Sequence, residues 1–234
     1  MIVGLVDELV VRKSAFLEAY RLVPSRFPPV TIFDELVAPE EIDVLQALES
    51  RTNDRLDLDQ LGEAGLIAPE DRVVGPGTTP VMAAFAHPNR SGSRFTDGRF
   101  GVYYCAARVD TAIKEVAFHR ARFLRESREP ACQIEMRCYV GRIRKHLHDG
   151  IGHGLDDKIL DPDSYHHSQP LGAALRDAGA YGLTYPSVRD PDGMCAALFR
   201  PPAIPVVQQT THYRFDFDGQ RITDVVELGA HTSL

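Results

Sequence analysis

The spacing of apolar and polar positions changes near residue 75 and divides the chain into two parts. Before that point, SAFLEAYRLV (14–23) and APEEIDVLQALESRTNDRL (38–56) repeat their apolar residues every three or four positions, which predicts two helices. The segment GPGTTP (75–80) then interrupts the pattern with turn-forming residues. We therefore expect a helical N-terminal extension over residues 1–75, packed on a larger unit over residues 76–234.

The larger unit mixes strand-like and helical patterns. Helices are predicted over 111–127, with Asp110 as the N-cap residue, and over 169–179, which ends in a glycine. Asp218-Gly219, between two alternating runs, predicts a β-hairpin over 211–228. Five further runs have the alternation or the aromatic and β-branched content of strands: 81–87, 101–107, 132–144, 181–187 and 194–199. This order of elements predicts an α+β fold.

Composition and charge limit the class of protein. Hydrophobic residues make up 44% and charged residues 25% of the 234 residues, which is typical of a soluble globular chain with a buried core. A formal net charge of −7 argues against nucleic acid as a direct partner. No apolar run is long enough to span a membrane, and Asp7 and Glu8 interrupt the early apolar run that a signal peptide requires. We expect a cytoplasmic protein.

The four cysteines show no metal or redox spacing. Cys105, Cys132, Cys138 and Cys195 include no CxxC pair, and each lies in an apolar or alternating run. We expect buried free thiols, as is usual in a reducing compartment.

Glu115 is the first candidate for chemistry. On a helical wheel it lies opposite the apolar stripe of the helix predicted over 111–127. The ordinary explanation is a solvated glutamate that pairs with Arg122 or Lys114. Phe118 lies beside Glu115 on the same side, however, and an aromatic residue there favours a cleft over open solvent.

Three other residues accompany Glu115. Arg94 lies in a loop before the strand predicted over 101–107, and its guanidinium is a forked donor suited to phosphate. Tyr104 lies on that strand and offers either core packing or an aromatic wall for a flat ring. Ser187 follows another predicted strand in a turn-rich loop, without the GxSxG context of a hydrolase nucleophile.

Together these residues resemble the motifs of the RES domain, a family named for its arginine, glutamate and serine. The first block of that family matches SRFTDGRFGVYYCAA and TAIKEV, in which the matching residues are Arg94, Phe95, Tyr104, Ala106, Ala112 and Glu115. The serine block matches GLTYPSVRDPDGMCAALF and identifies Ser187. Both blocks occur in the family's order, and the resemblance extends over roughly residues 80–205.

The resemblance implies an ADP-ribosyltransferase-like fold, with a mixed or antiparallel β core and flanking helices. It also implies NAD as a substrate, with no separate cofactor and no metal. Many RES proteins are toxins of bacterial toxin–antitoxin pairs, so a cognate antitoxin is the expected protein partner. The expected reaction breaks the nicotinamide–ribose bond by hydrolysis or phosphorolysis, or transfers ADP-ribose to a protein.

The same resemblance assigns roles to the residues. Cleavage of the nicotinamide–ribose bond passes through an oxocarbenium-like state, which the Glu115 carboxylate would stabilise. Arg94 would bind the diphosphate, and Tyr104 would stack near the nicotinamide or the ribose. Ser187 would hydrogen-bond the ribose or hold the glutamate.

The chain departs from the family pattern at one arginine. RES domains carry an arginine on the strand before the Arg94 block, where the predicted strand over 81–87 has Ala84 and Phe85. Arg21, or alternatively Arg26, from YRLVPSRFP would fill this gap and bind NAD.

Other interpretations stay open at this stage. The departure at the early arginine favours a catalytically weakened module that binds a partner, and an unrelated small-molecule enzyme is a further alternative. The segment HLHDGIGHG (146–154) and the pair His166-His167 offer metal ligands, but their spacing fits no standard site and the segment has the composition of a loop. The sequence leaves homo-oligomers open.

Overall fold

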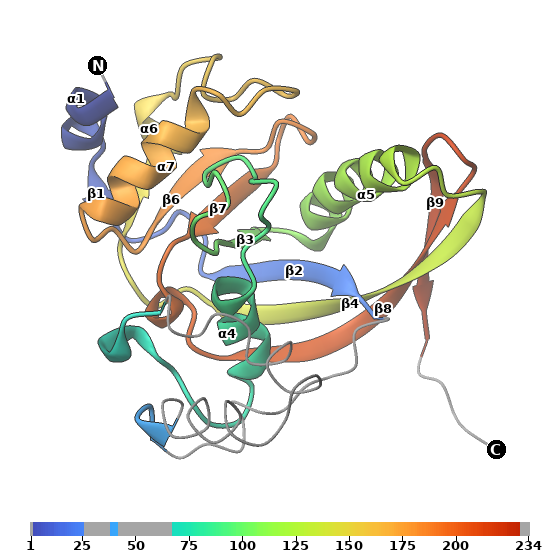
Figure 1. Cartoon of the computed structure of the whole chain (residues 1–234), viewed down its shortest axis with the longest axis horizontal. Coiled ribbons are helices and arrows are strands. Elements are labelled where there is room, and N and C mark those ends of the chain that lie inside the picture. The colour runs from blue at the N-terminus through green and yellow to red at the C-terminus, as the bar shows by residue number, and fades with distance from the viewer. Residues whose placement is uncertain (1, 26–37, 42–66, 230–234) are drawn as a thin grey trace.

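The computed structural model describes residues 2–25, 38–41 and 67–229, and its main feature is one large sheet (Figure 1). Within these residues the strand order is β1-β5-β6-β7-β3-β2-β4-β8-β9. β5 and β6 are parallel, and the other neighbours are antiparallel. The strands are β1 (Val11–Arg12), β2 (Glu18–Pro24), β3 (Tyr103–Ala106), β4 (Cys132–Arg142), β5 (Leu147–Asp149), β6 (Gly182–Pro186), β7 (Met194–Leu198), β8 (Val207–Phe217) and β9 (Ile222–Leu228).

Helices lie on both faces of the sheet. In the described part of the chain they are α1 (Ile2–Glu8), α4 (Thr79–Ala86), α5 (Val109–Glu126), α6 (Gly150–His153) and α7 (Ser168–Asp177), with 3-10 turns η2 (Pro69–Asp71) and η3 (Pro201–Ala203). α5 packs on β2, β3 and β9, whereas α4 packs on β3 and η3. The predicted α+β fold with a mostly antiparallel sheet and flanking helices is therefore confirmed.

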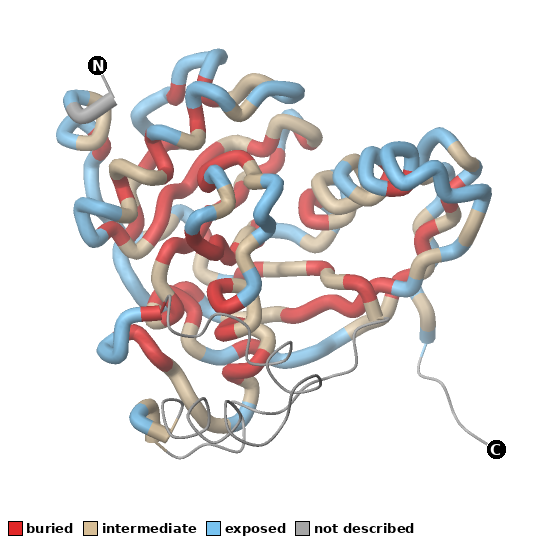
Figure 2. Tube along the Cα trace, viewed as in Figure 1, coloured by how far each residue is buried: buried red, intermediate tan, exposed pale blue. Residues whose placement is uncertain are grey.

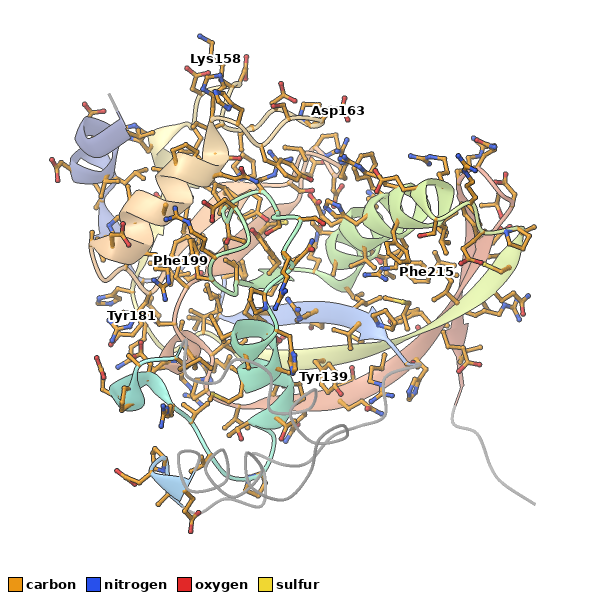
Figure 3. The ribbon with its side chains drawn as sticks, viewed as in Figure 1. Tyr139, Lys158, Asp163, Tyr181, Phe199 and Phe215 are labelled. Carbon is orange, nitrogen blue, oxygen red and sulfur yellow. The ribbon has the colours of Figure 1, made fainter. Side chains whose placement is uncertain are left out.

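The core has a cluster on each face of the sheet. The cluster beneath α5 and α7 includes Phe215, and the cluster beneath α4 includes Tyr139; these two side chains lie on opposite sides of the strands (Figure 3). Buried residues concentrate along the central strands, while α5 has an exposed outer side (Figure 2). Three of the cysteines are buried as expected, Cys132 is half-buried, and all four are free thiols.

The helix predicted over 14–23 is wrong, because residues 18–24 form β2 between β3 and β4. Both faces of β2 are covered: Tyr20 and Leu22 contact the cluster beneath α5, while Ala19 and Val23 contact the cluster beneath α4. Apolar residues on both faces hide the alternation of a strand. The expectation of a helical extension over residues 1–75 is therefore wrong for residues 18–24, which form a central strand of the sheet. The helix predicted over 38–56 falls almost entirely outside the described residues.

The strand predicted over 81–87 is also wrong, because α4 occupies these positions. Pro80 lies in its first turn, where a missing N–H costs little. Val81 and Phe85, four residues apart, are buried on one side of the helix. Gly101 permits close approach of the following loop, since a Cβ there would lie 2.4 Å from the Cα of Phe85.

Smaller differences concern helix starts and one loop. Arg108 is the N-cap residue of α5, and Asp110 instead lies in its first turn, where a negative charge suits the helix dipole. HLHDGIGHG forms β5 and α6 and not a loop. The β8–β9 hairpin is confirmed, and Gly219 in its turn has the positive φ of 98° that a glycine adopts without strain.

Candidate active site

Ser187 and Glu115 are joined directly. The Ser187 hydroxyl donates a hydrogen bond of 2.5 Å to Oε1 of Glu115. The Ser187 hydroxyl oxygen in turn accepts hydrogen bonds from the backbone N–H groups of Arg189, at 3.1 Å, and Asp190, at 3.0 Å. A serine hydroxyl has only one proton to donate. The two backbone donors therefore direct that proton at the carboxylate.

The β6–β7 connection places Ser187 at this position. β6 pairs antiparallel with β7, and the backbone N–H of Ser187 donates to the carbonyl oxygen of Gly193 at 2.8 Å, which closes the connection into a tight turn. We call residues 187–193 the serine turn. A Cβ at Gly193 would lie 2.6 Å from Cγ2 of Thr111, so the absence of a side chain lets the serine turn approach α5.

Asp190 anchors the serine turn to the start of α5. Its carboxylate accepts hydrogen bonds from Oγ1 of Thr111 at 2.6 Å, Nζ of Lys114 at 2.7 Å and Nη2 of Arg108 at 3.2 Å. The Asp190 side chain is only 5% exposed. The hydrogen bonds from Lys114 and then Thr111 lower the pKa of Asp190 to about 2.

This low pKa makes a prediction for stability against pH. A carboxyl group whose folded-state pKa lies below its ordinary value of 3.8 stabilises the fold above that value, and the contribution is lost as pH falls toward 2. We expect wild type to be more stable than Asp190→Asn near neutral pH, and the difference to shrink as pH falls from about 4 to about 2. Urea unfolding of both proteins across this range measures it; a difference independent of pH would contradict the anchoring carboxylate.

Arg94 lies beneath the surface and holds a neighbouring loop. Its Nη1 donates to the carbonyl oxygens of Ile159, at 3.2 Å, and Asp161, at 2.8 Å, and its guanidinium lies over the ring of Tyr165, 4.9 Å from the ring centroid. Within the described residues Nε and Nη2 make no hydrogen bond. Arg94 therefore fixes the loop over 159–165 and retains a donor edge for an anion.

Tyr104, on β3, contacts the loop that contains Arg94, which we call the Arg94 loop. Its hydroxyl accepts from the backbone N–H of Phe95 at 2.9 Å and shares a hydrogen bond of 2.8 Å with the Ser93 hydroxyl. Burial raises the pKa of Tyr104 to about 12, so the phenol stays neutral. The hydroxyl thus contacts both residues that flank Arg94. A role for the ring against nicotinamide or ribose stays a prediction.

The loop that Arg94 binds also contacts the serine turn, because Arg189 donates a hydrogen bond to the carbonyl oxygen of Pro162, between the two ends of that loop. The phenol of Tyr165 responds both to Arg94, which lowers its pKa, and to Glu115, which raises it; burial has the larger effect and raises the pKa overall. Tyr185 is buried and responds to the same two charges. The rings of Phe95 and Tyr185 are also in contact, with centroids 4.9 Å apart, so the loop that contains Arg94 adjoins the strand that ends at Ser187.

An aromatic and basic wall extends this region along α5. The guanidinium of Arg189 lies over the ring of Phe118, 3.3 Å from its centroid, and Arg189 also donates to the carbonyl oxygen of Pro162. Asp163 lies in the loop that projects toward α5 (Figure 3). A pocket of about 320 Å³ is lined by Phe118, Arg122, Arg125, Glu126 and Asp163. Phe118 therefore lines a pocket, and Glu115 is not among the lining residues, so a cleft at Glu115 stays a prediction.

His119 is a further titratable group at this wall. Desolvation, followed by the charges of Arg189 and Arg94, lowers the pKa of His119 to about 4. The positive charges of these arginines disfavour protonation of the imidazole. At neutral pH it is uncharged.

Arg21 is not brought to the Glu115–Ser187 pair. It follows Tyr20, which pairs with Ala106 of β3. Its Nη1 donates to the carbonyl oxygen of Tyr104 at 3.1 Å, and its guanidinium lies over the Tyr103 ring, 4.6 Å from the centroid. Tyr103 belongs to the cluster beneath α4, on the other face of the sheet from α5. NAD binding by Arg21 stays a prediction.

The structure corrects the motif match that placed the family's earlier arginine position at Ala84 and Phe85. Ala84 and Phe85 lie on α4, so they do not occupy a strand that precedes the Arg94 block. Among the described residues, the strand that precedes this block is β2, and Arg21 lies on it. Arg26, the alternative, is outside the described residues.

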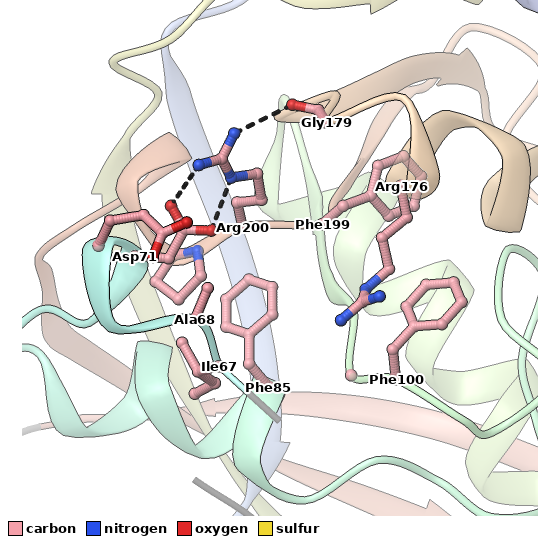
Figure 4. A pocket seen from close by; sticks show the side chains of 12 residues that line it. Ile67, Ala68, Asp71, Phe85, Phe100, Arg176, Gly179, Phe199 and Arg200 are labelled. Atoms are coloured by element: carbon pink, nitrogen blue, oxygen red, sulfur yellow. Dashed lines mark hydrogen bonds and ion pairs between the residues drawn. The ribbon is translucent and has the colours of Figure 1, made fainter. Parts of the chain in front are cut away.

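A second pocket of about 290 Å³ lies at the other end of the β6–β7 pair (Figure 4). The Phe85 and Phe100 rings form part of its wall, and Arg176 lies over Phe100, 4.8 Å from the ring centroid. Asp71 and Arg200 also line the pocket and form a bidentate salt bridge, with N···O distances of 2.6 and 2.8 Å. This pocket shares no lining residue with the predicted site.

Across residues 2–25, 38–41 and 67–229, no group of three histidine, cysteine or acidic side chains is arranged to hold a metal ion. In the same part of the chain, no helix has the length and apolar character needed to cross a membrane.

Sequence analysis missed several residues of this region. Asp190, Arg189 and Tyr165 lie in loops whose sequence suggests only turns, and their partners are distant in the sequence. The aspartate three residues after Ser187 was the available signal, because a serine hydroxyl often accepts from a backbone N–H at that spacing.

The fold and the region around Glu115 define an α+β domain with a serine-bound carboxylate and arginines in the neighbouring loops. Comparison with known proteins gives the family. A model of the RES domain matches residues 69–218, and the chain belongs to the RES domain family.

The chain is similar to proteins of known sequence and of known structure. The uncharacterized protein y4oC of Sinorhizobium fredii (strain NBRC 101917 / NGR234) is 29% identical over 214 residues, which cover 88% of this chain and 85% of the relative. The MbcT–MbcA toxin–antitoxin complex of M. tuberculosis contains a chain with a TM-score of 0.47 and 14% identity, and the similarity covers 93% of this chain and 92% of that one.

Proposed function

We propose that this protein is an NAD-consuming toxin that cleaves the nicotinamide–ribose bond, with water or phosphate as the acceptor. Membership of the RES domain family supports NAD as the substrate and a cognate antitoxin as the protein partner. The observation that carries the proposal is the 2.5 Å hydrogen bond between Ser187 and Glu115, which joins the two family motifs across 72 residues of sequence.

The proposed reaction begins with departure of neutral nicotinamide, which takes the electron pair of the C–N bond. Positive charge then develops on the ribose carbon and ring oxygen. Glu115 would stabilise this charge through Oε2, because Ser187 binds Oε1. Water or phosphate then adds to the ribose carbon. Hydrolysis yields ADP-ribose, nicotinamide and one proton.

The surrounding residues supply binding and orientation in this proposal. The Nε and Nη2 edge of Arg94 would bind the diphosphate of NAD through charge-assisted hydrogen bonds. The wall formed by Phe118 and Arg189 offers an aromatic and cationic surface beside the reacting sugar. Tyr104 and Tyr165 keep the Arg94 loop in place.

Expression in a bacterium tests the proposed activity in cells. We expect induction of wild type to lower the cellular NAD pool and arrest growth, whereas Glu115→Gln does neither at equal protein level. Glu129→Gln, an exposed glutamate just beyond α5, is the matched control and should behave as wild type.

The products separate the possible acceptors. Mass spectrometry of the lysate should find ADP-ribose or its phosphate ester. ADP-ribose attached to protein would instead indicate a transferase. An unchanged NAD pool would contradict the proposal and favour a partner-binding module.

A further inference from the structure

We propose that Asp190 is a positioning residue: its carboxylate holds the serine turn against α5 so that the Ser187 hydroxyl stays aligned on Glu115. This inference rests on the proposed function for its effect on catalysis, but the alignment itself is measurable without substrate. The proposal concerns the serine turn, residues 187–193, and the first two turns of α5.

Asp190 binds both halves of the candidate pair. Its backbone N–H donates to the Ser187 hydroxyl at 3.0 Å. Its side chain accepts from Thr111 and Lys114, and the latter directly precedes Glu115 on α5. One residue therefore connects the hydroxyl donor to the helix that carries the carboxylate acceptor.

The three side-chain donors to Asp190 cover the start of the helix. Arg108 is the N-cap residue, Thr111 lies in the first turn and Lys114 lies one turn further on. Donors on successive turns hold a carboxylate against one side of a helix. These contacts hold the serine turn at a fixed distance from α5 and at a fixed orientation relative to the helix axis.

The anchor requires a carboxylate. Oδ2 of Asp190 receives Thr111 and Arg108, and Oδ1 receives Lys114, so both oxygens act as acceptors. An asparagine at position 190 would have one acceptor oxygen, and its amide NH₂ would face a donor that the second carboxylate oxygen binds in wild type. The Thr111 side of the anchor is fully buried, which makes an unsatisfied group there costly.

Asp190 acts through Ser187 and does not contact the reacting atoms. Its carboxylate is occupied by α5 donors, whereas Glu115 is bound by the serine hydroxyl. Loss of the Asp190 carboxylate should therefore release the serine turn while Glu115 and its helix remain in place.

Amide hydrogen exchange tests the alignment without NAD. In wild type the Arg189 amide is protected by its hydrogen bond to the Ser187 hydroxyl. We expect Asp190→Asn to speed exchange at Arg189 about tenfold or more while the β4 amides keep their protection. Asp71→Asn is the matched control, because it removes a buried carboxylate paired with Arg200 at the other end of the β6–β7 pair.

The milder Thr111→Val variant keeps this experiment decisive if Asp190→Asn does not fold. It removes one donor at nearly constant volume and should speed Arg189 exchange in the same direction by a smaller factor. Unchanged Arg189 exchange in the folded variants would overturn the proposal.

Kinetics then tests positioning through Ser187. We expect Asp190→Asn to lower kcat about tenfold with a smaller change in KM, and the double variant with Ser187→Ala to be no slower than Ser187→Ala alone. If the double variant lost the product of the two single-variant factors in kcat, Asp190 would not act through Ser187, and the proposal would be overturned. If wild-type protein did not cleave NAD, the proposed function would fail, and amide exchange would still decide whether Asp190 aligns the pair.

Discussion

Glu115→Gln is expected to lower kcat for NAD cleavage by about a thousandfold, with little change in the melting temperature. The glutamine side chain has nearly the shape of glutamate, and its amide oxygen still accepts the hydrogen bond from Ser187. It carries no negative charge, however, so it cannot stabilise the cation that develops on the ribose. Glu115 is half-buried beside the serine turn and is not part of the apolar core.

Steady-state kinetics and circular dichroism measure the two halves of this expectation. Glu129→Gln serves as the charge-matched control and should retain the wild-type rate. NAD turnover by Glu115→Gln within tenfold of wild type would show that another group stabilises the transition state. Loss of the fold would show instead that Glu115 is structural.

Arg94→Lys is expected to raise KM for NAD by ten- to a hundredfold and to loosen the loop over 159–165. A lysine keeps the positive charge but cannot hold two carbonyl oxygens and also present a forked edge to a diphosphate. The wild-type guanidinium does the first through Nη1 and retains Nε and Nη2 for the second.

The control for this substitution lies in the same region of sequence. Arg99→Lys changes an exposed arginine that pairs with Asp97, and it should leave KM unchanged. Kinetics, together with limited proteolysis of the loop, distinguishes the two effects. An unchanged KM in a protein whose loop is cut faster would limit Arg94 to a structural role.

The fold could be predicted from sequence where one face of an element is polar. β4 alternates visibly, and the Asp218-Gly219 turn marks the β8–β9 hairpin, so both were predicted correctly. β2 was mistaken for a helix because the sheet is covered on both faces at that position. α4 was mistaken for a strand because eight mostly apolar residues carry too little periodicity to separate the two structures.

The site could be predicted only as a set of residue types. Motif order identified Glu115, Ser187 and Arg94; in the structure Ser187 binds Glu115 directly, and the loop that Arg94 binds contacts Arg189 of the serine turn. The contacts that organise them are tertiary: Asp190 lies 76 to 82 residues from its α5 donors, and Arg94 lies 65 and 67 residues from the carbonyl groups that it binds. Sequence spacing contains no signal for such pairs.

The most direct test of the account is nicotinamide release from NAD by the purified protein. The reaction is followed by proton NMR in buffer with and without inorganic phosphate, for wild type and Glu115→Gln. We predict that wild type releases one nicotinamide for each NAD consumed and forms ADP-ribose or its phosphate ester, and that Glu115→Gln releases almost none. No release above the protein-free rate, or equal release by both proteins, would contradict the assignment of Glu115 as the catalytic carboxylate of an NAD-consuming enzyme.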